Sequence, residues 1–445
     1  MNLESPQTSQ QAWKVLDRTL HFPNSDHKLW WDRLAPVLGP SLHLAGYDIE
    51  AQYRSLLAIY SAIIPSLGPF PNSNRTNVTW THALCNKAGP LEASINYQQG
   101  AKCAFRLGVE PVGPYAGTDA DPINEVAGKQ LLQRLSHVQP GGVVDLSLFD
   151  YFASALGVDA HAARTHWDSL AGFPCKSHTV VGVDFHHHHH HGAPPFTVKS
   201  YFGTFVKSVV AETDVLRLTF DSFRRLLCCP SSTRPAAAAA DDDDLHFDFS
   251  QVEEYVSANR DRFMLEKSYV AFDCKAPAQS RVKVYVMASV ASLREVYDFW
   301  TLGGRLRGAD LEAGFGIVKR VWNAIYPQQL PSGGHREAMQ IQVNWEMSLK
   351  NASVVPKIYL LVADDYDEHV SNAVVDLFED LGWTEHIQTH RLLEKEAYSI
   401  HGDCGFQGRT DCYLWLAFAY SGRSGPYITV YTNPVVSTAV PKCIT

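Results

Sequence analysis

The sequence lacks the cysteine patterns that mark disulfide-rich, redox-active and zinc-binding proteins. Its 445 residues include nine cysteines, an odd number, and no two of them form a CxxC pair. Structural zinc sites need ligands at short, defined spacings, and disulfide frameworks are typical of much shorter secreted chains. We therefore expect neither a disulfide framework nor a structural metal site.

Long apolar runs and basic runs are also missing. The longest apolar tract, residues 56–67, is interrupted by Ser61, Pro65 and Ser66, and it falls short of the roughly 18 residues that indicate a membrane span. Residues 1–17 contain no apolar core of a secretory signal. The net charge is −9 and no Lys/Arg-rich segment occurs, whereas nucleic-acid binders carry a basic patch. We expect a cytoplasmic protein with neither a membrane nor a nucleic-acid partner.

Common catalytic and nucleotide-binding motifs are absent as well: GxGxxG, GxxxxGK[ST], GxSxG and HExxH do not occur. What is present is a large apolar fraction. Hydrophobic residues make up 45% of the chain and charged residues only 19%, below the usual share of about 25%. This composition favours one large domain over residues 1–445.

Hydrophobic periodicity predicts helices over residues 1–65 and then strands that come in pairs separated by helices. Consecutive hairpins imply antiparallel order, and a closed barrel leaves no exposed edge. We therefore predict an α/β fold in which ten antiparallel strands close into a barrel inside a ring of helices. A parallel βαβ barrel is the rival, but it needs single strands between helices. The predicted strand pairs are 91–97 with 102–109, 180–185 with 197–205, 269–274 with 281–288, 339–347 with 357–362, and 410–420 with 426–432.

Two low-complexity segments interrupt the pattern, near residues 186–195 and 230–246. The first contains the run His186–His191, and the second contains Ala236–Ala240 followed by Asp241–Asp244. Both lie between predicted elements, so we interpret them as solvated loops. The sequence leaves open whether the histidine run is natural or an engineered tag.

The predicted strands carry cations and tyrosines on one face and β-branched residues on the other. In the strand that begins at Arg281, Lys283 and Tyr285 share its face, whereas Val282 and Val284 lie opposite. A surface strand would alternate in the same way. Across several strands, however, the polar faces hold cations, tyrosines and amides, which would make the lumen an anion trap suited to diphosphate. The same alternation holds for Lys199 with Tyr201, Lys357 with Tyr359, Tyr427 with Tyr431, Arg106 with Gly108, and Glu92 and Gln342 within their own strands.

These strands carry a resemblance that extends over nearly the whole chain. Its motifs are Leu29-Trp-Trp31, Pro65-Ser-Leu-Gly-Pro69, Pro90-Leu-Glu-Ala-Ser94, Arg106-Leu-Gly-Val-Glu-Pro111, Val198-Lys-Ser-Tyr-Phe202, Ser280-Arg-Val-Lys-Val-Tyr285, Trp300-Thr-Leu-Gly-Gly304, Pro356-Lys-Ile-Tyr359 and Gly425-Pro-Tyr-Ile-Thr-Val-Tyr431. Each short motif is weak alone, but their order and spacing together are specific. With them the chain resembles the fungal indole prenyltransferases, the dimethylallyltryptophan synthase family with the ABBA barrel (also called the PT barrel).

The resemblance implies roles for individual residues. Glu92 matches the acid that hydrogen-bonds the indole N–H, and we expect Glu92 and Lys199 to act in catalysis. Gln342 and Gly108 are expected to contact donor or acceptor. The expected diphosphate-binding cations are Arg106, Lys199, Arg281, Lys283 and Lys357, and the expected tyrosine shield is Tyr201, Tyr285, Tyr359, Tyr427 and Tyr431.

The implied activity is metal-independent transfer of a dimethylallyl group from dimethylallyl diphosphate to an indole, with no further cofactor. Because Gly108 leaves space beside Arg106, we expect a tryptophan-containing cyclic dipeptide or an indole alkaloid as acceptor. Free tryptophan, tyrosine and phenolic or polyketide acceptors stay open, as do a homodimer and a non-catalytic barrel that binds an amphipathic anion.

One acidic segment offers a metal-dependent alternative. Asp364-Asp-Tyr-Asp-Glu368 fits DDxx(D/E), the spacing that holds Mg²⁺ in metal-dependent prenyl enzymes. It follows a predicted strand and precedes a helix, where acids suit an N-cap and the helix dipole. No second acidic cluster with matching spacing occurs, so we expect a helix cap and no metal.

Overall fold

The computed structural model describes residues 11–435 except 75, 85–88, 139–143, 174–175, 188–193, 229–246, 327–336, 349–352, 364, 399–408 and 423–424. Its centre is a closed barrel in the order β1-β10-β9-β8-β7-β6-β5-β4-β3-β2, and every neighbouring pair is antiparallel. The predicted barrel is therefore confirmed. The strands are β1 (Leu91–Gln98), β2 (Ala104–Val109), β3 (Thr179–Phe185), β4 (Phe196–Gly203), β5 (Phe263–Asp273), β6 (Arg281–Val290), β7 (Met339–Ser348), β8 (Val354–Leu361), β9 (Tyr413–Ser421) and β10 (Gly425–Thr432).

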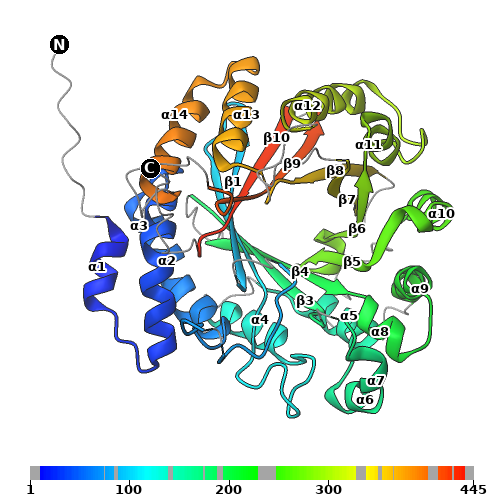
Figure 1. The fold of residues 1–445 in the computed structure, drawn as a ribbon, viewed down its shortest axis with the longest axis horizontal. Helices are drawn as coiled ribbons and strands as arrows, with labels where there is room; N and C mark the ends of the chain where they lie inside the picture. The colour runs from blue at the N-terminus through cyan, green and yellow to red at the C-terminus, as the bar shows by residue number, and fades with distance from the viewer. Residues whose placement is uncertain are drawn as a thin grey trace.

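Helices surround the barrel as a ring, with α1 to α3 on one side and the others following in chain order (Figure 1). Within the described residues, each strand hairpin is separated from the next by helices, as predicted. The helices are α1 (Ala12–Thr19), α2 (Ser25–Leu44), α3 (Ile49–Ala58), α4 (Ala127–Val138), α5 (Ser147–Leu156), α6 (Ala160–Thr165), α7 (Trp167–Leu170), α8 (Phe205–Val210), α9 (Val215–Cys228), α10 (Ser250–Ala258), α11 (Leu293–Trp300), α12 (Ala309–Ile325), α13 (Asp367–Asp380) and α14 (Thr384–Leu393).

Two features differ from the sequence-based prediction by more than a few residues at the end of an element. The hydrophobic periodicity of residues 120–170 predicts two helices, whereas these residues form four, α4 to α7. Strand β5 begins at Phe263 and not at Tyr269, because its pairing with β6 shifts register between Met264 and Tyr269. A bulge of this kind breaks the two-residue alternation from which the strand was predicted.

The apolar faces of the strands point outward against the helices. On β6, Val282, Val284 and Val286 are buried in the main hydrophobic cluster, and on β7 the indole N–H of Trp345 donates to the carbonyl oxygen of Phe299 on α11 at 3.2 Å. Burying each such side chain contributes about 1.5–3 kcal/mol. The opposite, polar face of each strand must then point into the barrel.

The histidine run is packed where it begins. The His187 ring stacks on Tyr47 with 3.9 Å between ring centroids, and its Nε2 lies 2.6 Å from the Cys103 carbonyl oxygen. His187, which the sequence places in a solvated loop, lies in a bend and is half-buried against this ring and carbonyl. Residues 188–193 and 229–246 lie outside the described residues.

No described helix has the length and apolar character of a membrane span.

The acidic segment accepts hydrogen bonds from the backbone at the start of a distant strand. Asp367 is buried at the start of α13, and its carboxylate accepts hydrogen bonds from the backbone N–H groups of Asp411, Cys412 and Tyr413 at 3.0–3.2 Å. It therefore anchors the start of β9, whereas the sequence had predicted a cap of its own helix. Asp364 lies outside the described residues, and the described residues contain no group of three potential metal ligands.

We expect Asp367→Asn to lower the free energy of unfolding by about 1–3 kcal/mol, because an amide oxygen cannot replace the carboxylate that accepts three buried N–H groups. Denaturant unfolding measures the change. Glu368→Gln is the matched control, since Glu368 is exposed in the same segment and should leave stability unchanged. Equal stability of the two variants would contradict the anchoring role.

Candidate active site

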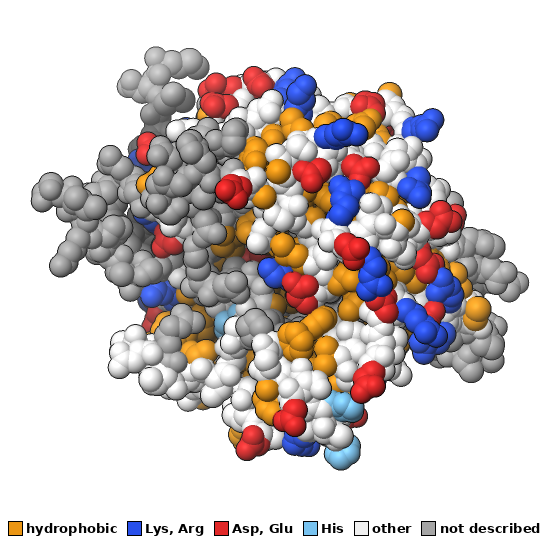
Figure 2. Space-filling model, turned by 45° about the vertical axis from the view of Figure 1, so that its right-hand side comes forward, with side chains coloured by type: hydrophobic (Ala, Val, Ile, Leu, Met, Phe, Trp, Pro, Cys, Tyr) orange, Lys and Arg blue, Asp and Glu red, His pale blue; other side chains and the backbone are white. Residues whose placement is uncertain are grey.

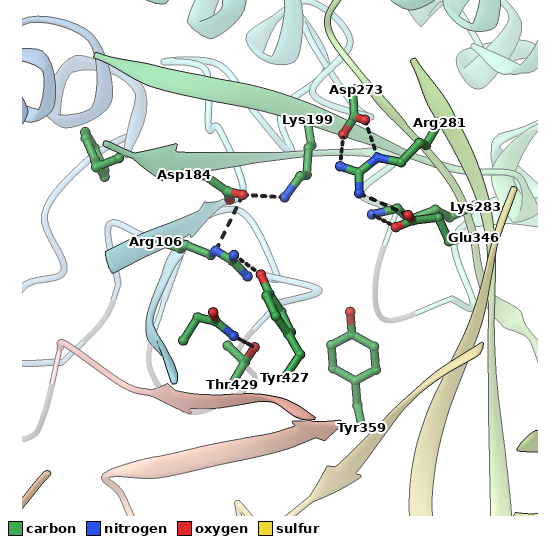
Figure 3. Close-up of polar contacts among 12 residues, drawn as sticks. Arg106, Asp184, Lys199, Asp273, Arg281, Lys283, Glu346, Tyr359, Tyr427 and Thr429 are labelled. Carbon is green, nitrogen blue, oxygen red and sulfur yellow. Dashed lines mark hydrogen bonds and ion pairs between the residues drawn. The ribbon is translucent and has the colours of Figure 1, made fainter. Parts of the chain in front are cut away.

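Four charged side chains form the first cluster in the barrel lumen (Figure 3). The Arg281 guanidinium donates from Nε to Asp273 at 2.7 Å and from Nη1 to Glu346 at 3.0 Å. The Lys283 ammonium lies 3.0 Å from the other oxygen of Glu346. These residues come from the adjacent strands β5, β6 and β7, so strand pairing itself brings them together.

A second cluster forms around Asp184 on β3. The Lys199 ammonium donates to Asp184 Oδ2 at 2.5 Å, and Arg106 Nε lies 3.4 Å from the same oxygen. Burial alone would raise the pKa of Asp184, but the charges of Arg106 and Lys199 hold it well below its ordinary value. Burial lowers the pKa of Lys199 to about 8, against the opposing effect of Asp184.

Lys357 on β8 lies between aromatic rings. Its ammonium is 4.8 Å from the centre of the Tyr359 ring and 5.3 Å from that of Tyr427. Burial lowers its pKa well below the ordinary value, and the charges of Arg106, Lys283 and Lys199 lower it further. Among the described residues, no ion-pair partner of Lys357 is found.

Four of the five expected tyrosines form a continuous row of rings. Centroid distances are 5.5 Å from Tyr201 to Tyr285, 6.0 Å from Tyr285 to Tyr359, and 5.9 Å from Tyr359 to Tyr431. The hydroxyls of Tyr285 and Tyr359 are 3.3 Å apart. Tyr427 stands apart from this row and hydrogen-bonds to the Arg106 guanidinium.

Glu92 on β1 carries a buried carboxylate that pairs with no cation of the described residues. The residue is 8% exposed, its Oε2 atom has no hydrogen-bond partner in the described part of the chain, and burial raises its pKa to about 8. Gly108 lies opposite on β2, and a Cβ atom there would come within 2.7 Å of Glu92 Oε1. The space left by the missing side chain of Gly108 therefore holds the Glu92 carboxylate, and the expectation that Gly108 itself leaves room for a larger acceptor was wrong.

Gln342 lies on β7 between Met287 and Tyr359 in the strand register, so it lines the same lumen. Besides Glu346, five lumen residues described here had no role assigned from the sequence. Strand alternation could have found them. Each lies on the lumen face of its strand, either two or four residues from an assigned residue or directly opposite one on the neighbouring strand. They are Asp184, Tyr269, Asp273, Asn344 and Trp415, of which Tyr269 and Trp415 pack against the tyrosine cluster and Asn344 donates to the Tyr359 hydroxyl at 3.2 Å.

We expect the Glu92 carboxyl group to titrate with a midpoint of about 8, because burial disfavours its charged form. Infrared difference spectra against Glu92→Gln isolate the carbonyl stretch of the protonated acid as a function of pH. If the band has already disappeared when the pH is raised to about 6, the environment described here is contradicted. An exposed glutamate would behave in that way, because it ionises near its ordinary pKa of about 4.3.

The chain and its fold match one enzyme family. A family model described as tryptophan dimethylallyltransferase matches residues 26–391. The indole diterpene prenyltransferase anaPT of Neosartorya fischeri is 30% identical over 438 residues, which cover 98% of this chain and 94% of the relative. The tryptophan dimethylallyltransferase of Arthroderma otae is 28% identical over 435 residues, 94% of this chain and 90% of that protein.

Solved structures agree with the sequence match. The crystal structure of AnaPT from Neosartorya fischeri superposes with a TM-score of 0.78 at 28% identity and covers 95% of this chain and 97% of that one. The barrel is thus the ABBA prenyltransferase fold. Because the family match spans most of the chain and the relatives span nearly all of it, the chain belongs to the tryptophan dimethylallyltransferase family of indole prenyltransferases.

Proposed function

We propose that the protein transfers a dimethylallyl group from dimethylallyl diphosphate to the indole ring of a tryptophan-containing cyclic dipeptide or an indole alkaloid, without a metal ion. The observation that carries this proposal is the meeting of three features in one lumen. These are two clusters of cations, a row of tyrosine rings, and the carboxylate of Glu92, which has an unpartnered oxygen. The names of the relatives support the donor and the indole class.

The cations would bind the diphosphate and stabilise it as it leaves. When the bond between the allylic carbon and oxygen breaks, the electron pair goes to the diphosphate, and negative charge grows on that oxygen. Fixed cations placed where charge develops lower the barrier, the role that Mg²⁺ has in other enzymes. The proposed set is Arg106, Lys199, Arg281, Lys283 and Lys357.

The tyrosine rings would shield the allylic cation. Each ring face can contribute about 0.5–2 kcal/mol of cation–π attraction. Burial raises the pKa of Tyr359 to about 12 and that of Tyr285 well above its ordinary value. The phenols therefore stay protonated, and a neutral phenol is a far weaker nucleophile than a phenolate. The cation then survives until the indole carbon attacks it.

Glu92 would complete the reaction as hydrogen-bond acceptor and base. Its unpartnered oxygen suits an indole N–H, which would raise the electron density of the ring. After carbon–carbon bond formation, the ionised carboxylate can take up the proton that the ring must lose. Because the pKa of Glu92 is about 8, this step should speed up as the pH rises toward that value. A positioned base of this kind typically contributes 10²–10⁴-fold, by a rough estimate.

The purified protein, dimethylallyl diphosphate and a panel of tryptophan, cyclic tryptophan dipeptides and phenols are incubated with excess EDTA. We expect an indole product heavier by one isoprene unit, detected by mass spectrometry. Product only after addition of Mg²⁺ would contradict metal independence. No product under either condition, together with binding of inorganic pyrophosphate, would favour the anion-binding barrel.

Glu92→Gln should lower turnover by roughly 10²–10⁴-fold, because the amide cannot accept the proton. Its affinity for inorganic pyrophosphate should stay close to that of the wild type, since Glu92 belongs to neither cation cluster. Unchanged turnover would show that this carboxylate is not the base.

The acceptor preference is tested by the ratio of kcat/KM for a cyclic tryptophan dipeptide to that for free tryptophan. We expect the ratio to exceed one. Gly108→Ala should depress both values, because its Cβ would displace the Glu92 carboxylate. Gly182→Ala on β3 is the matched control: the atoms nearest to its Cβ belong to the side chains of Tyr201 and Lys199 and lie at 3.4–3.7 Å, which is ordinary van der Waals contact. A far higher value for free tryptophan would overturn the proposed acceptor.

A further inference from the structure

Asp184 occupies the position that an anion would take between two of the proposed diphosphate ligands. Its Oδ2 atom accepts from the Lys199 ammonium at 2.5 Å and lies 3.4 Å from Arg106 Nε. The side chains of these three residues are only 16–19% exposed. Figure 3 shows both cations turned toward the carboxylate from neighbouring strands.

The other carboxylates of the cation clusters are engaged elsewhere. Asp273 and Glu346 hold Arg281, and Glu346 also holds Lys283. Among the described residues, Asp184 is thus the carboxylate paired with Arg106 and Lys199. The five cations face these three carboxylates and Glu92, whose pKa is raised to about 8, and the excess of positive charge suits a multiply charged anion.

Burial removes the hydration that keeps an ammonium group charged, and a nearby anion compensates for part of that loss. The charged groups around Lys199 come from several strands. Asp184 on β3 and Asp273 on β5 are negative, whereas Arg106 on β2, Lys283 on β6 and Lys357 on β8 are positive. The positive neighbours disfavour the charged form of Lys199, and Asp184 opposes them at hydrogen-bond distance.

We propose that Asp184 is a positioning residue that keeps Lys199 charged and in place while the site is empty, and that the diphosphate of the donor replaces it as the anionic partner. This inference rests on the proposed function, in which Lys199 and Arg106 bind the donor. Its consequence is that Asp184 has opposite effects at the two ends of the pH range. At low pH, Lys199 is charged in any case, and Asp184 only competes with the incoming diphosphate. At high pH, Asp184 keeps Lys199 charged and so preserves the cation that binds the diphosphate.

The test is the affinity of inorganic pyrophosphate, measured by calorimetry from about pH 6 to about pH 9, for the wild type and Asp184→Asn. At the acidic end the variant should bind as tightly as the wild type or more tightly. At the alkaline end it should bind about tenfold more weakly or worse, which corresponds to a downward shift of the Lys199 pKa by about one unit. The two curves should therefore cross.

Two variants separate this effect from general damage to the site. Asp273→Asn removes a carboxylate whose hydrogen-bond partner is Arg281 and not Lys199, and arginine keeps its charge over this range. The affinity of this variant at alkaline pH should therefore fall much less than that of Asp184→Asn. Asp184→Asn combined with Lys199→Arg should recover affinity at alkaline pH for the same reason. Asp184→Glu keeps the charge and should keep the wild-type alkaline limb even if Asp184→Asn folds poorly.

Parallel curves for the wild type and Asp184→Asn would overturn the inference and leave the donor site standing. Loss of the wild-type alkaline limb in Asp184→Glu would also overturn it. Absence of pyrophosphate binding by the wild type itself would instead overturn the proposed donor site, and with it this role of Asp184.

Discussion

The burial of several cations inside a closed barrel is the constraint on which the site depends. Removing an ion from water costs several kcal/mol even after relaxation, and a charge of the same sign nearby adds to that cost. The protein offsets the cost with three carboxylates and with aromatic rings. Asp184, Asp273 and Glu346 pair with four of the cations, and the ammonium of Lys357 lies over two tyrosine rings.

This arrangement fixes geometry as well as charge. Arg281 is held by two carboxylates on neighbouring strands, and Arg106 is held between Asp184 and the Tyr427 hydroxyl. Long side chains that would otherwise sample many rotamers are thereby ordered before any ligand arrives, which reduces the entropy cost of binding. The ring of helices makes this possible, because the outward apolar faces supply the folding free energy that a polar interior does not.

The environment of Glu92 differs from that of the three carboxylates that pair with cations. No cation of the described lumen residues forms an ion pair with Glu92, and burial raises its pKa. Such a group is poorly stabilised in the empty protein and has an oxygen free to accept a hydrogen bond. Perturbed carboxylates of this kind are common at active sites. The Glu92 side chain fits in this position because residue 108 on the facing strand is a glycine, and any larger residue would press on the carboxylate.

Much of the fold could be predicted from the sequence. Strand alternation is local, so the placing of Arg281, Lys283 and Tyr285 on one face follows from their spacing alone. Paired strands separated by helices likewise predicted the antiparallel barrel. The pattern failed where local order is broken, as at the bulge that hides the start of β5 and in the short helices α6 and α7.

The sequence by itself therefore determined which residues line the lumen and which chemistry they can carry. Only the tertiary structure decided their partners. Asp184 meets Arg106 and Lys199 through the register of β2, β3 and β4, and Asp367 meets the backbone at 411–413 across more than forty residues. Pair distances of this kind depend on how strands from distant parts of the chain are aligned. The alternation of side chains along one strand carries no information about that alignment.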